Sequence, residues 1–283
     1  MTKATAADNA AGGTPESRGW NLSEPIFLDT PELCGHRGSG RGVVRGHREN
    51  TLGSYRAVVE AGLRWVEVDA RVTADAVLVA SHDPVAADGR FIVDLTADQT
   101  DGLGLMRVED LLAELPAEVA INVEVKTSLE DALRPRGETT AALVADLVGP
   151  ESKRRRMLIS SFDPSGLAIV RERAPAVPTG FLTWMGFPLR KAIPAAVHMG
   201  ADVVAPQIAS FRLGKAESPR VEREPLEMVR VAHEAGLQVV AWCPTPDQGD
   251  QLIAAGVDCL IVDDVPTAVE HYRSRLAPES RNR

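Results

Sequence analysis

Two carboxylates and a histidine come close together in the stretch 64–84. Glu67 and Asp69 are two residues apart in a run with strand composition, so the alternation of a strand points both side chains to one face. The apolar run that follows comes too soon for a crossover helix, which predicts a hairpin turning at Asp75 and Ala76. That hairpin places His82 opposite Asp69. Two carboxylates this close repel each other, and a divalent cation relieves the repulsion.

A solvated surface is the alternative interpretation of this pattern. A Glu-x-Asp alternation also occurs on the water-facing side of an antiparallel pair, where it carries no function. Here Trp65, Val66 and Val68 surround the acids, which is typical of a half-buried strand with its acids at one end. These apolar neighbours favour a functional site.

The composition excludes several classes of protein. With 283 residues, of which 44% are hydrophobic and 25% charged, the chain is long enough for one large globular domain or two small ones. The net charge of −9 argues against nucleic-acid binding, and no stretch reaches the roughly 18 apolar residues of a membrane span. Three cysteines without a CxxC pair indicate neither disulfides nor a zinc ribbon, so a reducing cytoplasm is expected. No pattern indicates an oligomeric state.

The two ends of the chain differ from the middle. Residues 1–22 are rich in small and polar residues and lack the features of a signal peptide, so we expect them to be disordered. Residues 277–283 are expected to form a short polar tail. The segment 23–276 is left as one domain.

Strand-like and helix-like segments alternate within that domain. Strands are expected at 32–36, 119–125, 157–160, 178–182, 202–206, 238–242 and 257–262, in addition to the strand that begins at Arg64. Helical patterns lie between them at 52–61, 139–148, 164–173, 189–199, 226–235 and 247–255. Four of these helices are followed by glycine, the residue preferred after a helix C-terminus. Eight such units predict an α/β fold, a (β/α)8 TIM barrel with a short hairpin insertion after strand two.

The ends of these strands carry the polar residues of the domain. Active sites of such barrels lie at the carboxyl ends of the strands. Asp263, which follows the last expected strand, is one of these residues and is equally compatible with a helix N-cap. The other residues at expected strand ends are His36, Arg37, Glu67, Asp69, Glu124, Lys126, Trp242 and Asp264.

An ordered set of motifs resembles the glycerophosphodiester phosphodiesterase family over residues 33–272. Each motif is weak alone, and their order makes the set specific. The motifs are Gly35-His36-Arg37-Gly38, Glu49-Asn50-Thr51, Glu67-Val68-Asp69, Ser81-His82-Asp83, Asn122-Val123-Glu124-Val125-Lys126, Ser160-Ser161-Phe162, Trp242 and Gly256-Val257-Asp258.

The resemblance implies a barrel enzyme that hydrolyses glycerophosphodiesters to glycerol 3-phosphate and an alcohol. It also implies one divalent cation, Mg²⁺ or Ca²⁺, which all-oxygen ligands favour over zinc. Of the two histidines, we expect His36, beside Arg37, to be the base and His82 to be the acid. The further residues that the resemblance implies are Glu67, Asp69 and Glu124 as metal ligands and Arg37, Glu49, Lys126 and Trp242 as substrate-binding residues.

Three departures from the family pattern bear on substrate choice. Arg48 stands where members often have proline before Glu-Asn-Thr, and Ala76 stands where the hairpin usually has glycine. The family's Trp-Thr-Val-Asn is Trp242-Cys243-Pro244-Thr245 here. None of the three touches the expected metal ligands or histidines.

Two other functions stay open. A lysophospholipase D would act on a substrate that keeps an acyl chain, and the apolar residues Trp184, Met185, Phe187 and Pro188 after strand five could form a lip for that chain. A non-catalytic barrel that binds a phosphorylated ligand is the second alternative. Against it, the sequence keeps both histidines and all three carboxylates.

Overall fold

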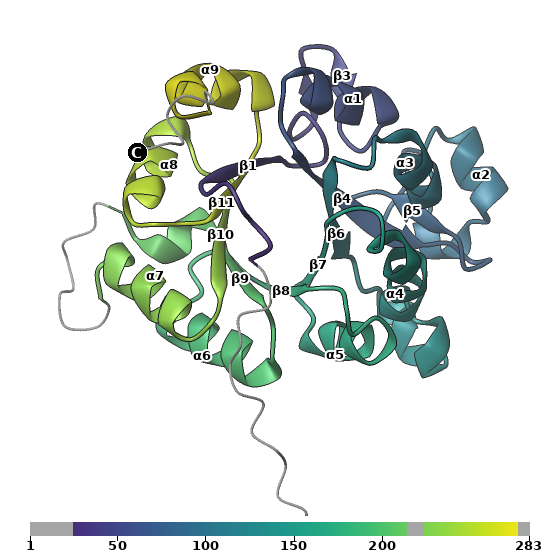
Figure 1. Cartoon of the computed structure of the whole chain (residues 1–283). Coiled ribbons are helices and arrows are strands. Elements are labelled where there is room, and N and C mark those ends of the chain that lie inside the picture. Colours follow the sequence, from purple (N-terminus) through teal and green to yellow (C-terminus); the bar gives the residue numbers. More distant parts are fainter. Residues whose placement is uncertain (1–24, 214–222, 277–283) are drawn as a thin grey trace, which may run out of the picture.

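Eight parallel strands form a closed barrel in the computed structural model, which describes residues 25–213 and 223–276 (Figure 1). The strands follow one another around the barrel in chain order, and β1 closes it by pairing with both β4 and β11. The expected (β/α)8 barrel is therefore confirmed, and the expectations for 1–22 and 277–283 lie outside the described residues. The barrel strands are β1 (Glu32–Gly35), β4 (Trp65–Val72), β6 (Ala120–Val125), β7 (Met157–Ser161), β8 (Thr179–Thr183), β9 (Val203–Pro206), β10 (Gln238–Trp242) and β11 (Cys259–Val262).

Helices surround the barrel, and the six predicted ones are present. The four glycines predicted to follow helices have φ between 73° and 89°, as expected of a left-handed C-terminal residue. Two short helices after the hairpin, α2 (Ala97–Gly102) and α3 (Val108–Glu114), and the last helix α9 (Val265–Leu276) were not predicted. No described helix has the combined length and apolar character needed to cross a bilayer. The six predicted helices are α1 (Leu52–Glu60), α4 (Thr140–Glu151), α5 (Pro164–Arg173), α6 (Leu189–Met199), α7 (Pro225–Glu234) and α8 (Pro246–Ala254).

The barrel interior is apolar at one end and charged at the other. Along β4 the inward residues are Trp65, Glu67 and Asp69, and Trp65 packs in a buried apolar cluster with Phe27 from the segment before β1. The register between strands sets Glu67 beside Asn122 and Asp69 beside Glu124. The alternation of β4 thus places its aromatic residue deep in the barrel and its two acids toward the carboxyl end of the strands.

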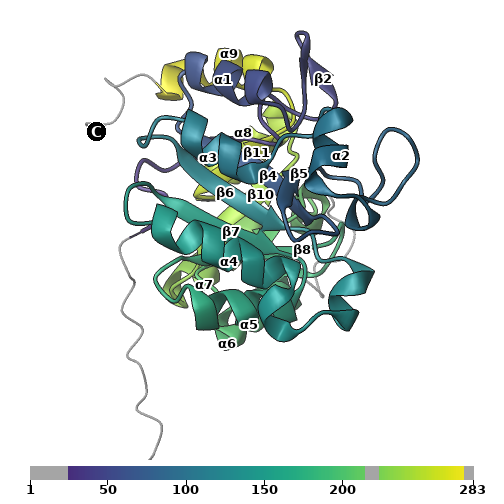
Figure 2. The same ribbon diagram turned by 90° about the vertical axis from the view of Figure 1, so that its right-hand side faces the viewer.

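Extra elements gather at that carboxyl end (Figure 2). A small hairpin, β2 (Val43–Val44) with β3 (His47–Arg48), lies in the glycine-rich loop before α1. A second hairpin joins β4 to the antiparallel strand β5 (Leu78–Ala80). Four 3-10 turns complete the described elements: Ile92–Asp94, Leu129–Leu133, Arg136–Glu138 and Ile208–Phe211.

The register of the β4–β5 hairpin differs from the predicted register by one residue, so that prediction was wrong. Ala70 pairs with Ala80, and the Ser81 N–H donates to the Asp69 carbonyl at 3.0 Å, so Asp69 lies opposite Ser81 and not His82. The reason is a three-residue loop, 74–76, closed by the Thr73 N–H bonded to the Val77 carbonyl at 2.9 Å. A turn centred on Asp75 and Ala76 would have had an even number of residues.

Ala76 occupies the left-handed position of this loop at φ 64°, a conformation that glycine adopts without steric cost. We expect Ala76→Gly to raise the free energy of unfolding by about 0.5–1 kcal/mol, because it relieves that strain. Urea denaturation measures the change. Ala74→Gly is the matched control, since Ala74 is exposed in the same loop without a positive φ and should lose stability. A loss of stability in both variants would contradict the strain argument.

Candidate active site

Three buried carboxylates form the floor of the site. Glu67 and Asp69 come from β4 and Glu124 from the neighbouring β6, and one oxygen of each lies within 4.8 Å of the others. Glu67 Oε1 is buried and has no hydrogen-bond partner. The register of two adjacent parallel strands therefore concentrates negative charge at one point, as the sequence predicted.

The three carboxyl groups differ in the direction in which their pKa values are shifted. Burial and the nearby charge of Asp69 raise the pKa of Glu67 to about 8, and burial also raises the pKa of Glu124. Burial opposes the charge of Asp69 as well, but the Lys126 ammonium and the Arg37 guanidinium outweigh it and lower the pKa of Asp69. The site as described is thus short of positive charge at Glu67.

Arg37 and Lys126 are the cations that contact the carboxylates. Lys126 Nζ lies 3.0 Å from Asp69 Oδ1 and also bonds Glu124. Arg37 Nε lies 3.4 Å from Asp69 Oδ2, and Arg37 Nη1 lies 3.1 Å from Glu49 Oε1. Four carboxylates thus face two cationic side chains, and a divalent cation would balance the difference. An all-oxygen donor set with an unpartnered buried oxygen suits a hard cation such as Mg²⁺ or Ca²⁺.

A buried polar chain that the sequence reasoning missed supports Asp69 from behind. The Tyr55 hydroxyl donates to Asn50 Oδ1 at 2.8 Å, and Asn50 Nδ2 donates to Asp69 Oδ2 at 2.9 Å. Tyr55 is fully buried on α1, and Asn50 is buried at φ 55°. The Glu-Asn-Thr motif was the available signal, and only its glutamate was assigned a role. This series of hydrogen bonds occupies Asp69 Oδ2 and leaves Asp69 Oδ1 for other partners.

We expect Tyr55→Phe to lower the free energy of unfolding by about 1–2 kcal/mol, because the buried Asn50 oxygen loses its donor. We also expect weaker binding of Mg²⁺, since Asn50 no longer holds Asp69 in place. Tyr272→Phe is the matched control: its hydroxyl donates to the Pro246 carbonyl at 2.8 Å, away from the site. Calorimetry would contradict the supporting role if both variants bound Mg²⁺ equally well.

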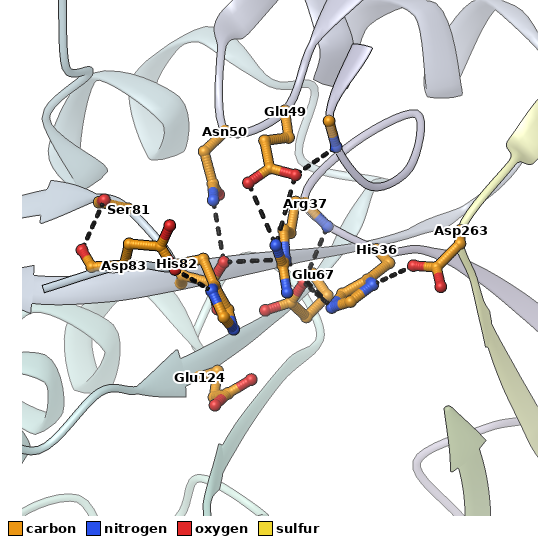
Figure 3. A network of polar contacts seen from close by, with 12 residues as sticks. His36, Arg37, Glu49, Asn50, Glu67, Ser81, His82, Asp83, Glu124 and Asp263 are labelled. Carbon is orange, nitrogen blue, oxygen red and sulfur yellow. Dashed lines mark hydrogen bonds and ion pairs between the residues drawn. The ribbon is translucent and has the colours of Figure 1, made fainter. Parts of the chain in front are cut away.

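His36 follows β1 and is held on two sides (Figure 3). Its Nδ1 lies 2.5 Å from Asp263 Oδ1, and Arg37 Nε donates to its Nε2 at 3.3 Å. The second contact leaves the ring proton on Nδ1 and the lone pair on Nε2, which lies 4.0 Å from Glu67 Oε2. Burial opposes protonation, but Asp263, Cys243 and Glu67 outweigh it and raise the pKa of His36.

Asp263 is therefore a partner of His36 and not the helix cap that was the alternative. The cap of α9 is Asp264, whose carboxylate accepts from the Thr267 N–H at 3.0 Å and the Thr267 hydroxyl at 2.9 Å. The two adjacent aspartates differ in role because the Asp263 side chain is directed toward His36 and the Asp264 side chain toward the first turn of α9. The sequence could not distinguish them.

His82 lies across the site from His36, with Arg37 and Glu67 between the two histidines (Figure 3). Two nitrogens of Arg71 donate to its carbonyl at 2.6 and 3.0 Å, and its Nδ1 lies 2.8 Å from Asp83 Oδ1. Burial and the charge of Lys126 lower the pKa of His82. Although the predicted register was wrong, these contacts still bring His82 to the site.

A cavity of about 460 Å³ joins these groups at the mouth of the barrel. The Trp242 indole N–H donates to the Ala205 carbonyl at 3.1 Å, so only its ring is available to a ligand. Phe162 stacks on Trp184 with ring centroids 4.2 Å apart and meets Trp242 edge-on. One wall of the cavity is thus aromatic and the floor is charged. Seven of the nine predicted site residues line this cavity, and the other two, Glu49 and Asp69, contact Arg37 at its edge.

Comparison with known proteins decides the family. The model of the glycerophosphoryl diester phosphodiesterase family matches residues 36–267. The chain belongs to this family. The probable glycerophosphodiester phosphodiesterase 2 of Mycobacterium tuberculosis is 30% identical over 231 residues, which is 76% of this chain and 81% of the relative. This chain is accordingly an enzyme, a phosphoric diester hydrolase that acts on glycerophosphodiesters.

Solved structures agree on the fold. The glycerophosphodiester phosphodiesterase of Thermotoga maritima superposes with a TM-score of 0.64 at 23% identity, covering 84% of this chain and 96% of that one. A phosphodiesterase of Oleispira antarctica, solved in complex with the product sn-glycerol-3-phosphate, superposes with a TM-score of 0.69 at 19% identity, covering 86% of this chain and 97% of that one. Both are barrels of the same kind.

Proposed function

We propose that this phosphodiesterase converts glycerophosphodiesters to glycerol 3-phosphate and an alcohol, with a divalent cation and two histidines. The observation that carries the proposal is that the carboxylate cluster of Glu67, Asp69 and Glu124 adjoins the cavity that His36 and His82 line. The bound glycerol 3-phosphate of the Oleispira antarctica enzyme supports the choice of product. A cation held by the three carboxylates would neutralise charge on the phosphoryl oxygens.

The residues of the chain divide the remaining work. Lys126 and Arg37 hold the non-bridging oxygens of the phosphodiester. Glu49 orients Arg37, because it accepts from the same guanidinium nitrogen at 3.1 and 3.3 Å. The ring of Trp242 packs against the organic part of the substrate.

Proton transfer is proposed in two steps, as the family resemblance implies. The 2-hydroxyl oxygen of the glycerol moiety bonds to phosphorus and gives its proton to His36 Nε2. The bond from phosphorus to the alcohol oxygen breaks, and this oxygen takes a proton from His82. Water then opens the cyclic phosphate, with the two histidines in exchanged roles.

The contact from Arg37 Nε to His36 Nε2 supports His36 as the first base, because a ring nitrogen that accepts a hydrogen bond carries no proton of its own. The raised pKa of His36 and the lowered pKa of His82 argue the other way. Part of that rise comes from Glu67, whose charge a bound cation would cancel, whereas the Arg37 contact does not depend on the cation. We therefore retain His36 as the base and His82 as the acid.

A lysophospholipid is the second candidate substrate. Trp184 is 67% exposed and Met185 is 74% exposed, directly after β8 at the mouth of the barrel. Such apolar side chains could contact an acyl chain. We favour the deacylated diester because the cavity of about 460 Å³, which Trp184 lines and Met185 does not, has room for a small headgroup.

Assays of glycerophosphocholine and lysophosphatidylcholine, each with Mg²⁺, with Ca²⁺ and with EDTA, test the proposal. We expect turnover of glycerophosphocholine that EDTA abolishes. Turnover of lysophosphatidylcholine alone would favour lysophospholipase D. Absence of cation-dependent turnover of either substrate would leave the barrel as a non-catalytic binder of phosphorylated ligands.

Two broader proposals rest on the same chain. We propose that residues 23–276 act as one barrel domain. We also propose a reducing, cytoplasmic site of action, which the free thiols of Cys34, Cys243 and Cys259 support.

A further inference from the structure

A second group of possible metal ligands lies at the barrel mouth, separate from the carboxylate floor. His36, Cys243 and Asp263 each offer one atom, and these atoms lie within 4.8 Å of one another. They follow β1, β10 and β11, which are neighbours in the sheet. The Cys243 N–H also bonds the Ile261 carbonyl of β11 at 2.9 Å. The framework of the barrel therefore holds the three residues together.

The donor set differs in chemistry from the all-oxygen floor. It combines an imidazole nitrogen, a thiol sulfur and a carboxylate oxygen, which are the three donor types of protein zinc sites. Tetrahedral zinc, with bonds of roughly 2.3 Å to sulfur and 2.0–2.1 Å to nitrogen, sets these two atoms roughly 3.6 Å apart. Cys243 Sγ lies 3.7 Å from His36 Nδ1. The sulfur and the nitrogen thus already have the required spacing.

Asp263 is the ligand that would have to move. Its Oδ1 lies 2.5 Å from His36 Nδ1, closer than two ligands of one zinc ion, and its side chain is 37% exposed. A partly exposed carboxylate can turn about its own bonds without disturbing packed neighbours. We propose that His36 Nδ1, Cys243 Sγ and Asp263 bind Zn²⁺ and that this binding inhibits the enzyme.

Inhibition follows from the tautomer of His36 and so rests on the proposed function. In the described structure the ring proton is on Nδ1, between His36 and Asp263, and the unprotonated Nε2 accepts the Arg37 Nε–H. Zinc at Nδ1 moves the ring proton to Nε2, and the Cys243 thiol gives its own proton to solvent. The ring then presents an N–H where the reaction needs a lone pair. His36 can no longer act as the base.

Cobalt provides a test of binding that is independent of activity. Co²⁺ is added to the full-length protein in saturating Mg²⁺, which occupies the carboxylate floor. We expect a thiolate-to-cobalt charge-transfer band that Zn²⁺ removes by competition. Cys243→Ser should lose the band, and Cys259→Ala, which changes a fully buried thiol away from the group, should keep it. Absence of the band from the wild-type protein, or its persistence in Cys243→Ser, overturns the site.

Inhibition is measured in the same buffer with glycerophosphocholine. We expect Cys243→Ser to raise the Zn²⁺ concentration for half-inhibition by at least roughly 10–100-fold, because that range is seen when a metal ligand loses only its supporting partner and Cys243 is itself a ligand. Equal inhibition of the variant and the wild type would overturn the inhibitory role. If the wild type shows no turnover, the proposed function fails, and the cobalt band alone still decides whether the site exists.

Discussion

Replacing His36 or His82 by alanine is expected to lower kcat by roughly 10²–10⁴-fold in each case, the range typical of one lost proton transfer. The two side chains line one cavity with Arg37 and Glu67 between them, so neither can replace the other (Figure 3). Calorimetry should show that Mg²⁺ still binds, because neither histidine belongs to the carboxylate floor. Steady-state kinetics with glycerophosphocholine measures the loss.

His198→Ala is the matched control, since His198 is exposed on α6, which covers the outside of the barrel. It should keep wild-type kinetics. A substrate with a leaving group of low pKa, such as p-nitrophenol, needs no acid and should restore activity only to the variant that lacks the general acid. We expect rescue of His82→Ala. Rescue of His36→Ala instead would reverse the two roles.

Replacing Glu67 by glutamine is expected to abolish most cation-dependent turnover and to change stability in opposite directions with and without the cation. Without the cation, the pKa of Glu67 is raised to about 8 in the folded protein. An acid whose folded pKa is raised binds more protons when folded, so the stability of the wild type should fall as the pH rises from about 4.5 toward 8. Glutamine has no charge to bury, and the variant should lose less stability over this range.

Thermal unfolding in EDTA and in Mg²⁺ separates the two effects. In EDTA at pH 8, we expect Glu67→Gln to be at least as stable as the wild type. In Mg²⁺ we expect the wild type to gain stability by ligand binding and the variant to gain much less. Glu114→Gln, an exposed substitution on α3, should behave as the wild type in both. An equal gain in Mg²⁺ for Glu67→Gln would mean that Glu67 is not a ligand.

The sequence by itself determined the barrel and the charged floor of the site. Alternation along 65–69 is a local property of a strand, so it already placed Glu67 and Asp69 on one face. Glycines after helices likewise act within one turn of chain, and four of them marked helix ends correctly. The two short helices after the hairpin were missed because six or seven residues carry too little periodicity to recognise.

Tertiary structure decided the contacts between distant strands. His36 and Asp263 are separated by 227 residues and meet only because β1 and β11 close the barrel. No local pattern distinguishes Asp263, which meets His36, from Asp264, which caps α9. The register of His82 depended on one residue of loop length, and a one-residue slip turns every side chain of a strand to the other face. Local periodicity therefore gives the faces of strands, whereas closure of the barrel decides which side chains meet across it.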